Sequence, residues 1–190
     1  MAQEVSLACR VLLAAVFAIS VLSKVHSRAA WQSYRSWLAS LPVAPLRASW
    51  APAALACAEF AVIVGVAIPL GSGDLAGAGL AAGSALCLAL TAGLAIALRR
   101  GSWQPCHCFG ASSEPLGRQQ VLRNALLTVF AITGMLGWAF AGHQRLGTGP
   151  AGLAVIGGLS ATIVIVFFGD LVAILSPQPG ASPAPRPGAG

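Results

Sequence analysis

The chain has 190 residues, of which 57% are hydrophobic and only 8% are charged, whereas soluble domains carry about 25% charged residues. This composition excludes an ordinary soluble domain and indicates an integral membrane protein. The formal net charge of +6 does not indicate a nucleic-acid partner, because the basic residues are scattered along the connections between apolar runs. The segments also lack the alternating polarity of transmembrane β-strands. We therefore predict an all-α, polytopic membrane helix bundle whose surrounding partner is the lipid bilayer.

Apolar runs long enough to cross a bilayer follow one another along most of the chain. The first run resembles a signal peptide in length. However, Arg10 lies inside its start, Lys24 closes it, and no small-residue cleavage site follows, so we predict that it stays in the mature chain as a helix. The predicted spans are 7–23, 52–70, 75–98, 122–141 and 153–175.

These four to five spans form one predicted transmembrane domain over residues 1–175. The tail, residues 176–190, consists of Pro, Gly, Ala and Ser with few large apolar groups, and we predict that it is disordered. After the first span, tryptophans and a tyrosine alternate with arginines between Lys24 and Trp50, which is typical of the headgroup layer. Residues 29–38 are predicted to form a short amphipathic helix at the membrane interface.

Glu59 lies inside the second span, where a charge in lipid costs several kcal/mol. Such a residue needs a partner or a proton. Lys24 is the natural partner, because antiparallel neighbouring helices bring the end of the first span and the start of the second to one face of the membrane. The alternative is that Glu59 faces the headgroups or stays neutral.

Two thiols, Cys106 and Cys108, flank His107 in a polar connection between the third and fourth spans. The basic pair Arg99 and Arg100 lies close by and favours the thiolate form. A disulfide closed across a single residue is strained, and strained disulfides exchange readily. The loop thus suits thiol exchange, although two chance cysteines remain the alternative. For the cysteines inside the spans, Cys9, Cys57 and Cys87, we predict a packing role.

Arg123 and Asn124 are polar residues at the start of the fourth span, one loop after the thiols. They either hold the loop and stabilise a thiolate or serve as an interfacial anchor. No cofactor is predicted from the sequence.

A lysine that closes the first span, a glutamate in the second, a Cys-x-Cys-Phe-Gly loop and an Arg-Asn pair after it together resemble the MauE family of DoxX-like membrane proteins. Here these elements are Lys24, Glu59, residues 106–110 and the pair Arg123 and Asn124. The resemblance covers about residues 5–140. His107 stands where small residues are common in the family.

The resemblance implies a multi-pass membrane protein associated with methylamine metabolism. It further implies a role in disulfide formation or in maturation of methylamine dehydrogenase, with a thioredoxin-like partner. A general membrane thiol-redox function is the broader form of this hypothesis, in which the chain is an accessory to a thiol–disulfide oxidoreductase. Cys106 and Cys108 then carry the exchange, while Glu59 and Lys24 form a proton-handling or structural pair.

Two hypotheses from other classes stay open. In the first, Cys106, His107 and Cys108 handle Cu(I) or Zn(II), although three consecutive residues rarely point at one ion. In the second, the chain is a non-catalytic membrane scaffold that binds a partner through the aromatic, basic stretch around Trp31, Arg35 and Trp37. A transporter is less favoured, because the sequence shows no paired inverted halves.

The basic residues also predict an orientation in the cell membrane. With five spans, one side receives nine of the eleven Lys and Arg residues and the other receives only Arg10 and Arg145. The positive-inside rule therefore places the Cys-x-Cys loop at the cytoplasmic face. This expectation conflicts with an extracytoplasmic disulfide-forming role, because the cytosol keeps thiols reduced.

Overall fold

The computed structural model of the protein describes residues 1–67, 73–100, 118–141 and 147–168, and all statements below refer to these residues. They form six α-helices and one short 3₁₀ helix, and the prediction of an all-helical fold is confirmed. The predicted tail and the Cys-x-Cys loop lie outside the described residues. In chain order the elements are α1 (Ala2–Val25), α2 (Arg28–Ser40), η1 (Ala44–Arg47), α3 (Ala51–Ala67), α4 (Gly73–Arg99), α5 (Arg118–Ala141) and α6 (Thr148–Val166).

Four of the helices, α1, α4, α5 and α6, are long and apolar enough to cross a membrane. The shorter apolar helix α3 has 17 residues and packs beside α1 and α4 in the same bundle. At about 1.5 Å per residue it extends for roughly 26 Å, close to the thickness of the hydrocarbon layer. The protein is therefore a multi-pass membrane protein with four candidate spans and a shorter fifth helix among them.

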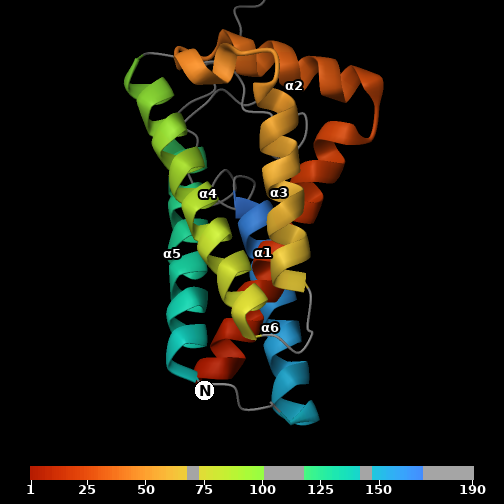
Figure 1. Ribbon diagram of the computed structural model, residues 1–190, viewed down its shortest axis with the longest axis vertical. Helices are drawn as coiled ribbons and strands as arrows, with labels where there is room; N and C mark the ends of the chain where they lie inside the picture. Colours follow the sequence, from red (N-terminus) through yellow and green to blue (C-terminus); the bar gives the residue numbers. More distant parts are fainter. Residues whose placement is uncertain (68–72, 101–117, 142–146, 169–190) are drawn as a thin grey trace, which may run out of the picture.

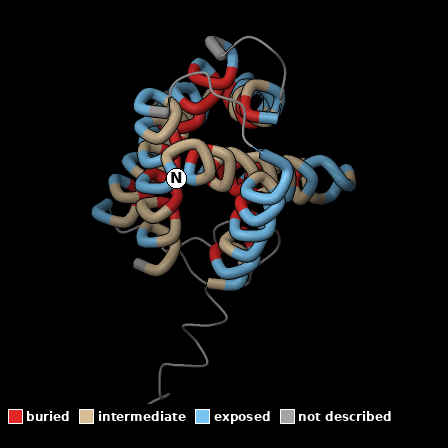
Figure 2. The backbone as a smooth tube through the Cα atoms, turned by 90° about the horizontal axis from the view of Figure 1, so that it is seen from below, coloured by how far each residue is buried: buried red, intermediate tan, exposed pale blue. Residues whose placement is uncertain are grey.

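The outer surface of the bundle is apolar, as expected for contact with lipid. Large hydrophobic side chains such as Phe140 and Leu153 are 82% and 74% exposed. Figure 2 shows that exposed residues line the outer sides of the helices, while buried ones face inward. Because water would make so much exposed apolar surface unfavourable, a bilayer is the environment in which this fold is stable.

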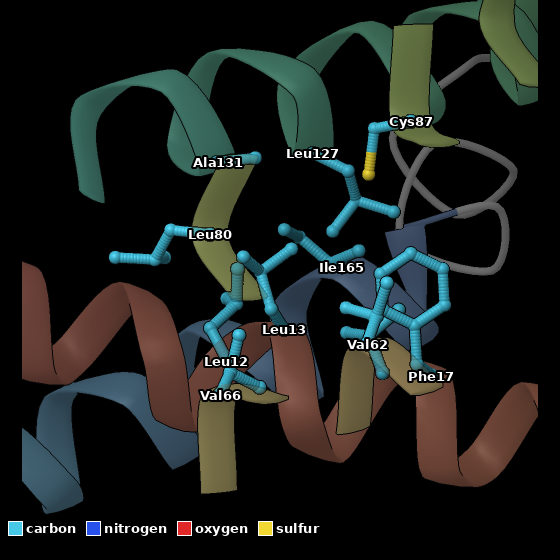
Figure 3. Close-up of a cluster of buried hydrophobic side chains, with 11 residues drawn as sticks. Leu12, Leu13, Phe17, Val62, Val66, Leu80, Cys87, Leu127, Ala131 and Ile165 are labelled. Atoms are coloured by element: carbon cyan, nitrogen blue, oxygen red, sulfur yellow. The ribbon is translucent and has the colours of Figure 1, made fainter. Parts of the chain in front are cut away.

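The interior contains a group of buried side chains that we call the central core. Its residues come from α1, α3, α4, α5 and α6, and Figure 3 shows them pointing toward one another. Because the cluster draws on five helices, it fixes the positions of all of them at once. The members are Leu12, Leu13, Val16, Phe17, Val62, Val66, Leu80, Cys87, Leu127, Ala131 and Ile165.

Glycines allow the helices around the central core to approach closely. A Cβ added at Gly79 on α4 would lie 2.5 Å from the carbonyl carbon of Gly65 on α3, so the two backbones touch there. Gly77 packs in the same way under the ring of Trp138 on α5. Close approach of helices through small residues is typical of packing within membranes.

Helix α2 lies across one end of the bundle of spanning helices (Figure 1). The Ser27 hydroxyl caps its start by accepting a hydrogen bond from the Ala30 backbone N–H, and the chain becomes extended at Leu41, before a proline. The predicted interfacial helix after the first span is thus present. Its apolar face joins residues of α3 and α4 in a second cluster, the α2 cap: Tyr34, Trp37, Leu38, Leu41, Ala51, Leu94 and Ala97.

The α2 cap changes the interpretation of the aromatic residues in this stretch. The sequence pattern indicates side chains in the headgroup layer, and Trp50 fits it because it is 65% exposed. In contrast, Tyr34 and Trp37 are buried, since the amphipathic helix turns them toward the bundle. Composition can indicate an interface, but only the packing decides which aromatic residues face it.

Candidate functional site

A buried ion pair joins the end of α1 to α3. The Lys24 ammonium lies 2.5 Å from Oε1 and 2.7 Å from Oε2 of Glu59, and both side chains are only 3% exposed. The pairing expected from the sequence is therefore present. It arises because α1 and α3 run side by side and place both residues at the same depth in the bundle.

Further contacts surround the ammonium group. Its nitrogen donates to the Ser20 hydroxyl at 2.9 Å, and that hydroxyl in turn donates to Glu59 Oε2 at 3.3 Å. The ammonium also lies 5.0 Å from the centroid of the Tyr34 ring, in the range of a cation–π interaction. Two carboxylate oxygens and one hydroxyl give each of the three N–H groups an acceptor, so the buried charge is compensated.

A cavity of about 120 Å³ lies beside this ion pair, at the seam between the central core and the α2 cap. Lys24, Glu59 and Ser20 form part of its lining, and most of the rest is apolar. Gly93 on α4 also lines the cavity, and a Cβ added there would meet no atom within 4 Å. An apolar void of similar size in an engineered protein holds a benzene molecule. The cavity is thus large enough for a small ring or a few water molecules.

Polar residues at the α4–α5 contact continue from the cavity. Asn124 is buried, lines the cavity and donates from its side chain to the Gln120 carbonyl. One turn further, the Thr128 and Thr91 hydroxyls lie 3.2 Å apart and join the two helices. Arg123, the other half of the predicted pair, is half-buried. The structure therefore brings Asn124, Lys24 and Glu59 to one cavity, at the same end of the bundle as Arg123.

The last turn of α4 and the first turn of α5 lie at this same end of the bundle (Figure 1). Helix α4 ends at Arg99, and the next residue, Arg100, donates a hydrogen bond to the Pro42 carbonyl in the connection after α2. Helix α5 begins at Arg118. The chain thus enters and leaves segment 101–117 at the end that holds the ion pair. Cys106, His107 and Cys108 lie within that segment, outside the described residues.

The cysteines inside the helices are free thiols. Cys9 and Cys87 are buried, and Cys57 is exposed on α3. No group of three or more His, Cys, Asp or Glu side chains that could hold a metal ion occurs in the described ranges. The hypothesis of a metal site therefore rests on residues 106–108 alone, because the described part of the chain supplies no second group of ligands.

A comparison with protein families identifies the chain. The family model described as methylamine utilisation protein MauE matches residues 2–137. The chain belongs to the MauE family. The match includes the lysine, the glutamate, the Cys-x-Cys segment and the Arg-Asn pair that carried the resemblance in the sequence, whereas α6 lies beyond it. Searches of curated proteins and of solved structures found no match.

In this MauE-family protein, some residues around the ion pair were not singled out from the sequence. Ser20 precedes Lys24 by four positions and therefore lies on the same face of α1, a signal that helical spacing could have revealed. Tyr34 comes from α2 and Gly93 comes from α4, as does Cys87, for which the sequence predicted only a packing role. No local pattern places these three beside the ion pair, because only tertiary packing brings them to the cavity.

Proposed function

We propose that this MauE-family protein is a thiol–disulfide redox or maturation factor of the membrane, with Cys106 and Cys108 as its reactive pair. The observation that carries the proposal is the Cys-x-Cys motif between two basic helix ends, within the part of the chain that the family model matches. Cysteines that lie beside cationic groups are more fully deprotonated and exchange more readily.

The exchange conserves electrons between this chain and a protein partner. In the oxidising direction, a thiolate of the partner attacks the Cys106–Cys108 disulfide, forms a mixed disulfide and releases one thiolate of this chain. The partner's second thiolate then attacks the mixed disulfide. The partner ends as a disulfide and this chain as a dithiol, so two electrons have moved to this chain. The reverse sequence reduces the partner.

The surroundings of the motif support this role. Arg100, Arg118 and Arg123 belong to the helix ends that bracket segment 101–117, and the buried Lys24–Glu59 pair lies at the same end. In the proposal, the cations favour the thiolate, and the ion pair holds α1 against α3 so that the bracketing helices keep their spacing. The name of the family suggests clients in methylamine utilisation, such as methylamine dehydrogenase, with a thioredoxin-like partner.

The alternative of a non-catalytic scaffold is less well supported by the packing. That hypothesis uses Trp31, Arg35 and Trp37 as a docking face. Trp37 is 7% exposed and belongs to the α2 cap, so its ring is occupied within the bundle. A partner could reach Arg35, whereas the Trp37 ring is covered by the bundle.

The test replaces Cys106 and Cys108 with serine, separately and together, in a host where the maturation of a disulfide-bonded client is measured. We expect the double variant to lose client oxidation or reduction. Each single variant should accumulate a mixed disulfide with the partner, because the resolving thiol is missing. The mixed disulfide is detected as a reductant-sensitive band and identified by mass spectrometry.

Cys57→Ser is the matched control, because Cys57 is an exposed thiol on α3. It should leave both activity and partner trapping unchanged. Full client maturation by the double variant Cys106→Ser/Cys108→Ser would falsify the proposal. Labelling of the two thiols with a membrane-impermeant reagent, before and after reduction, then reports the side of the membrane and the redox state together.

A further inference from the structure

A groove on the outer side of α2 is lined by two arginines and shares only Leu46 with the cavity beside the ion pair. It lies between α2 on one side and η1 with the start of α3 on the other, and its volume is about 430 Å³. Its lining includes no acidic residue and no residue of the Lys24–Glu59 cluster. The lining residues are Gln32, Arg35, Ser36, Ala39, Leu46, Arg47, Ala48, Ser49 and Pro52.

The two guanidinium groups of the groove, on Arg35 and Arg47, belong to exposed residues on different elements. Neither forms an ion pair within the part of the chain that the structure describes. Two like charges that face one groove repel each other, so an anion between them would be stabilised. Guanidinium groups bind phosphate oxygens through paired, charge-assisted hydrogen bonds.

Neutral hydrogen-bonding groups complete the lining. Gln32 and Ser36 lie on α2 beside Arg35, and Ser49 lies beside Arg47. The Ser36 hydroxyl donates to the Ser33 carbonyl, which leaves its oxygen lone pairs free for a hydroxylated ligand. The apolar side chains of Leu46 and Pro52 provide one less polar wall. Such a mixture fits a phosphate that is attached to a glycerol and to hydrocarbon.

The position of the groove favours a lipid as the source of that phosphate. Helix α2 lies across the end of the bundle, so the groove is at the level where the spanning helices end (Figure 1). Trp50, which follows the groove residue Ser49, is 65% exposed, as tryptophans at the membrane interface often are. The inward face of α2 is already held by Tyr34, Trp37 and Leu38. The arginines on the outer side are therefore not needed to attach the helix.

We propose that this groove binds the phosphate of an anionic phospholipid, with Arg35 and Arg47 as its two cationic contacts. The bound phosphate lies between the two arginines, reduces their mutual repulsion and holds α2 at the membrane surface. This site does not depend on the Cys-x-Cys loop or on redox chemistry. It can therefore be tested in the protein whether or not the proposed function holds.

The experiment measures lipid binding to the purified full chain by native mass spectrometry, with phosphatidylglycerol and phosphatidylcholine as the probes. We expect the protein to retain phosphatidylglycerol more strongly. Each juxtamembrane arginine contributes about a fivefold preference for anionic lipid, so R35Q/R47Q should weaken phosphatidylglycerol binding by roughly 30-fold. Binding of phosphatidylcholine should change little, because that headgroup carries no net charge.

R28Q is the matched control, since it removes the same charge from the same helix but Arg28 does not line the groove. It should keep most of the preference for phosphatidylglycerol. If R28Q lost as much phosphatidylglycerol binding as R35Q/R47Q, the site would be overturned, because the anionic lipid would then be attracted to any positive charge on α2. Inorganic phosphate that displaces phosphatidylglycerol at similar concentration would overturn the assignment to lipid. An unchanged preference in R35Q/R47Q would overturn the proposal altogether.

Discussion

The central core and the α2 cap are built in different ways, although α4 runs through both. In the central core, glycines bring helix backbones into contact and every member of the cluster is apolar or a free cysteine. At the α2 cap, aromatic side chains from a helix across the bundle cover the end, and a cavity and a buried ion pair lie beneath them. The close-packed half fixes the positions of the helices.

The half beneath the α2 cap is where chemistry is concentrated. The ion pair, Asn124, the end of α4 and the start of α5 all lie there, whereas the members of the central core are apolar residues and one cysteine. A buried charge pair and a void are each unfavourable unless the rest of the fold compensates them. The close packing of the central core therefore compensates for the unfavourable charge pair and void beneath the α2 cap, the region in which a functional site is expected.

The largest expected effect comes from removing one member of the ion pair. Glu59→Leu leaves the Lys24 ammonium buried without its carboxylate, and the free energy of unfolding should fall by about 3–5 kcal/mol. Lys24→Met should have a similar effect on the remaining carboxylate. Reversible unfolding in mixed micelles measures both changes. The control is Glu4→Gln, which removes an exposed contact at 3.6 Å with the N-terminus and should change the free energy by less than about 0.5 kcal/mol.

The double variant Lys24→Met/Glu59→Leu separates structure from proton handling. Apolar side chains of similar size replace both charges, so stability should return to within about 1 kcal/mol of the wild type. If this folded variant also keeps client maturation, the pair is structural only. A stable double variant without activity would assign the pair a part in the reaction. A double variant as unstable as Glu59→Leu would contradict the charge-compensation argument.

The next effect tests the close-packed half. Gly79→Ala places a methyl group 2.5 Å from the backbone of Gly65, so α3 and α4 must separate. We expect a loss of about 1–3 kcal/mol in the free energy of unfolding, because backbone cannot move aside as a flexible side chain can. Thermal unfolding of the purified protein measures the change. Wild-type stability in this variant would show that the helix contact is looser than the structure has it.

A matched substitution on the same helix should raise the free energy of unfolding instead of lowering it. Gly93→Ala adds a methyl group where no atom lies within 4 Å, at the edge of the cavity. Alanine also costs less conformational entropy in a helix than glycine, so the variant should gain about 0.5–1 kcal/mol. Parallel unfolding of the Gly79 and Gly93 variants compares the two halves directly. A destabilised Gly93→Ala would mean that the cavity is occupied.

The smallest expected effect lies at the boundary between the halves. The Thr91 and Thr128 hydroxyls, 3.2 Å apart, join α4 to α5. In a double-mutant cycle with Thr91→Val and Thr128→Val, the coupling energy should be about 0.6 kcal/mol, the average for hydrogen bonds between membrane helices. Each hydroxyl has one proton and also lies within reach of a carbonyl of its own helix, so in the direct bond one threonine donates across the helices and the other keeps its bond to its own helix. Additive effects in the cycle would contradict a direct bond.

The sequence by itself determined the fold class, the family and the pairing of Lys24 with Glu59. Long apolar runs specify membrane helices because hydrocarbon leaves the backbone no other hydrogen-bond partners. A charge inside such a run requires compensation, and few residues are able to supply it. These inferences rest on local composition and on the short list of allowed partners, so they do not depend on packing details.

Tertiary structure alone decided the rest of the site. It turned Tyr34 and Trp37 inward, brought Cys87 and Gly93 to the cavity and set the Gly65–Gly79 contact. Nearly every residue of a membrane helix is apolar, so the pattern that separates core from surface in soluble helices is weak here. Which apolar face meets another helix and which meets lipid depends on how side chains from distant segments fit together. That fit is a property of the assembled bundle and of no single segment.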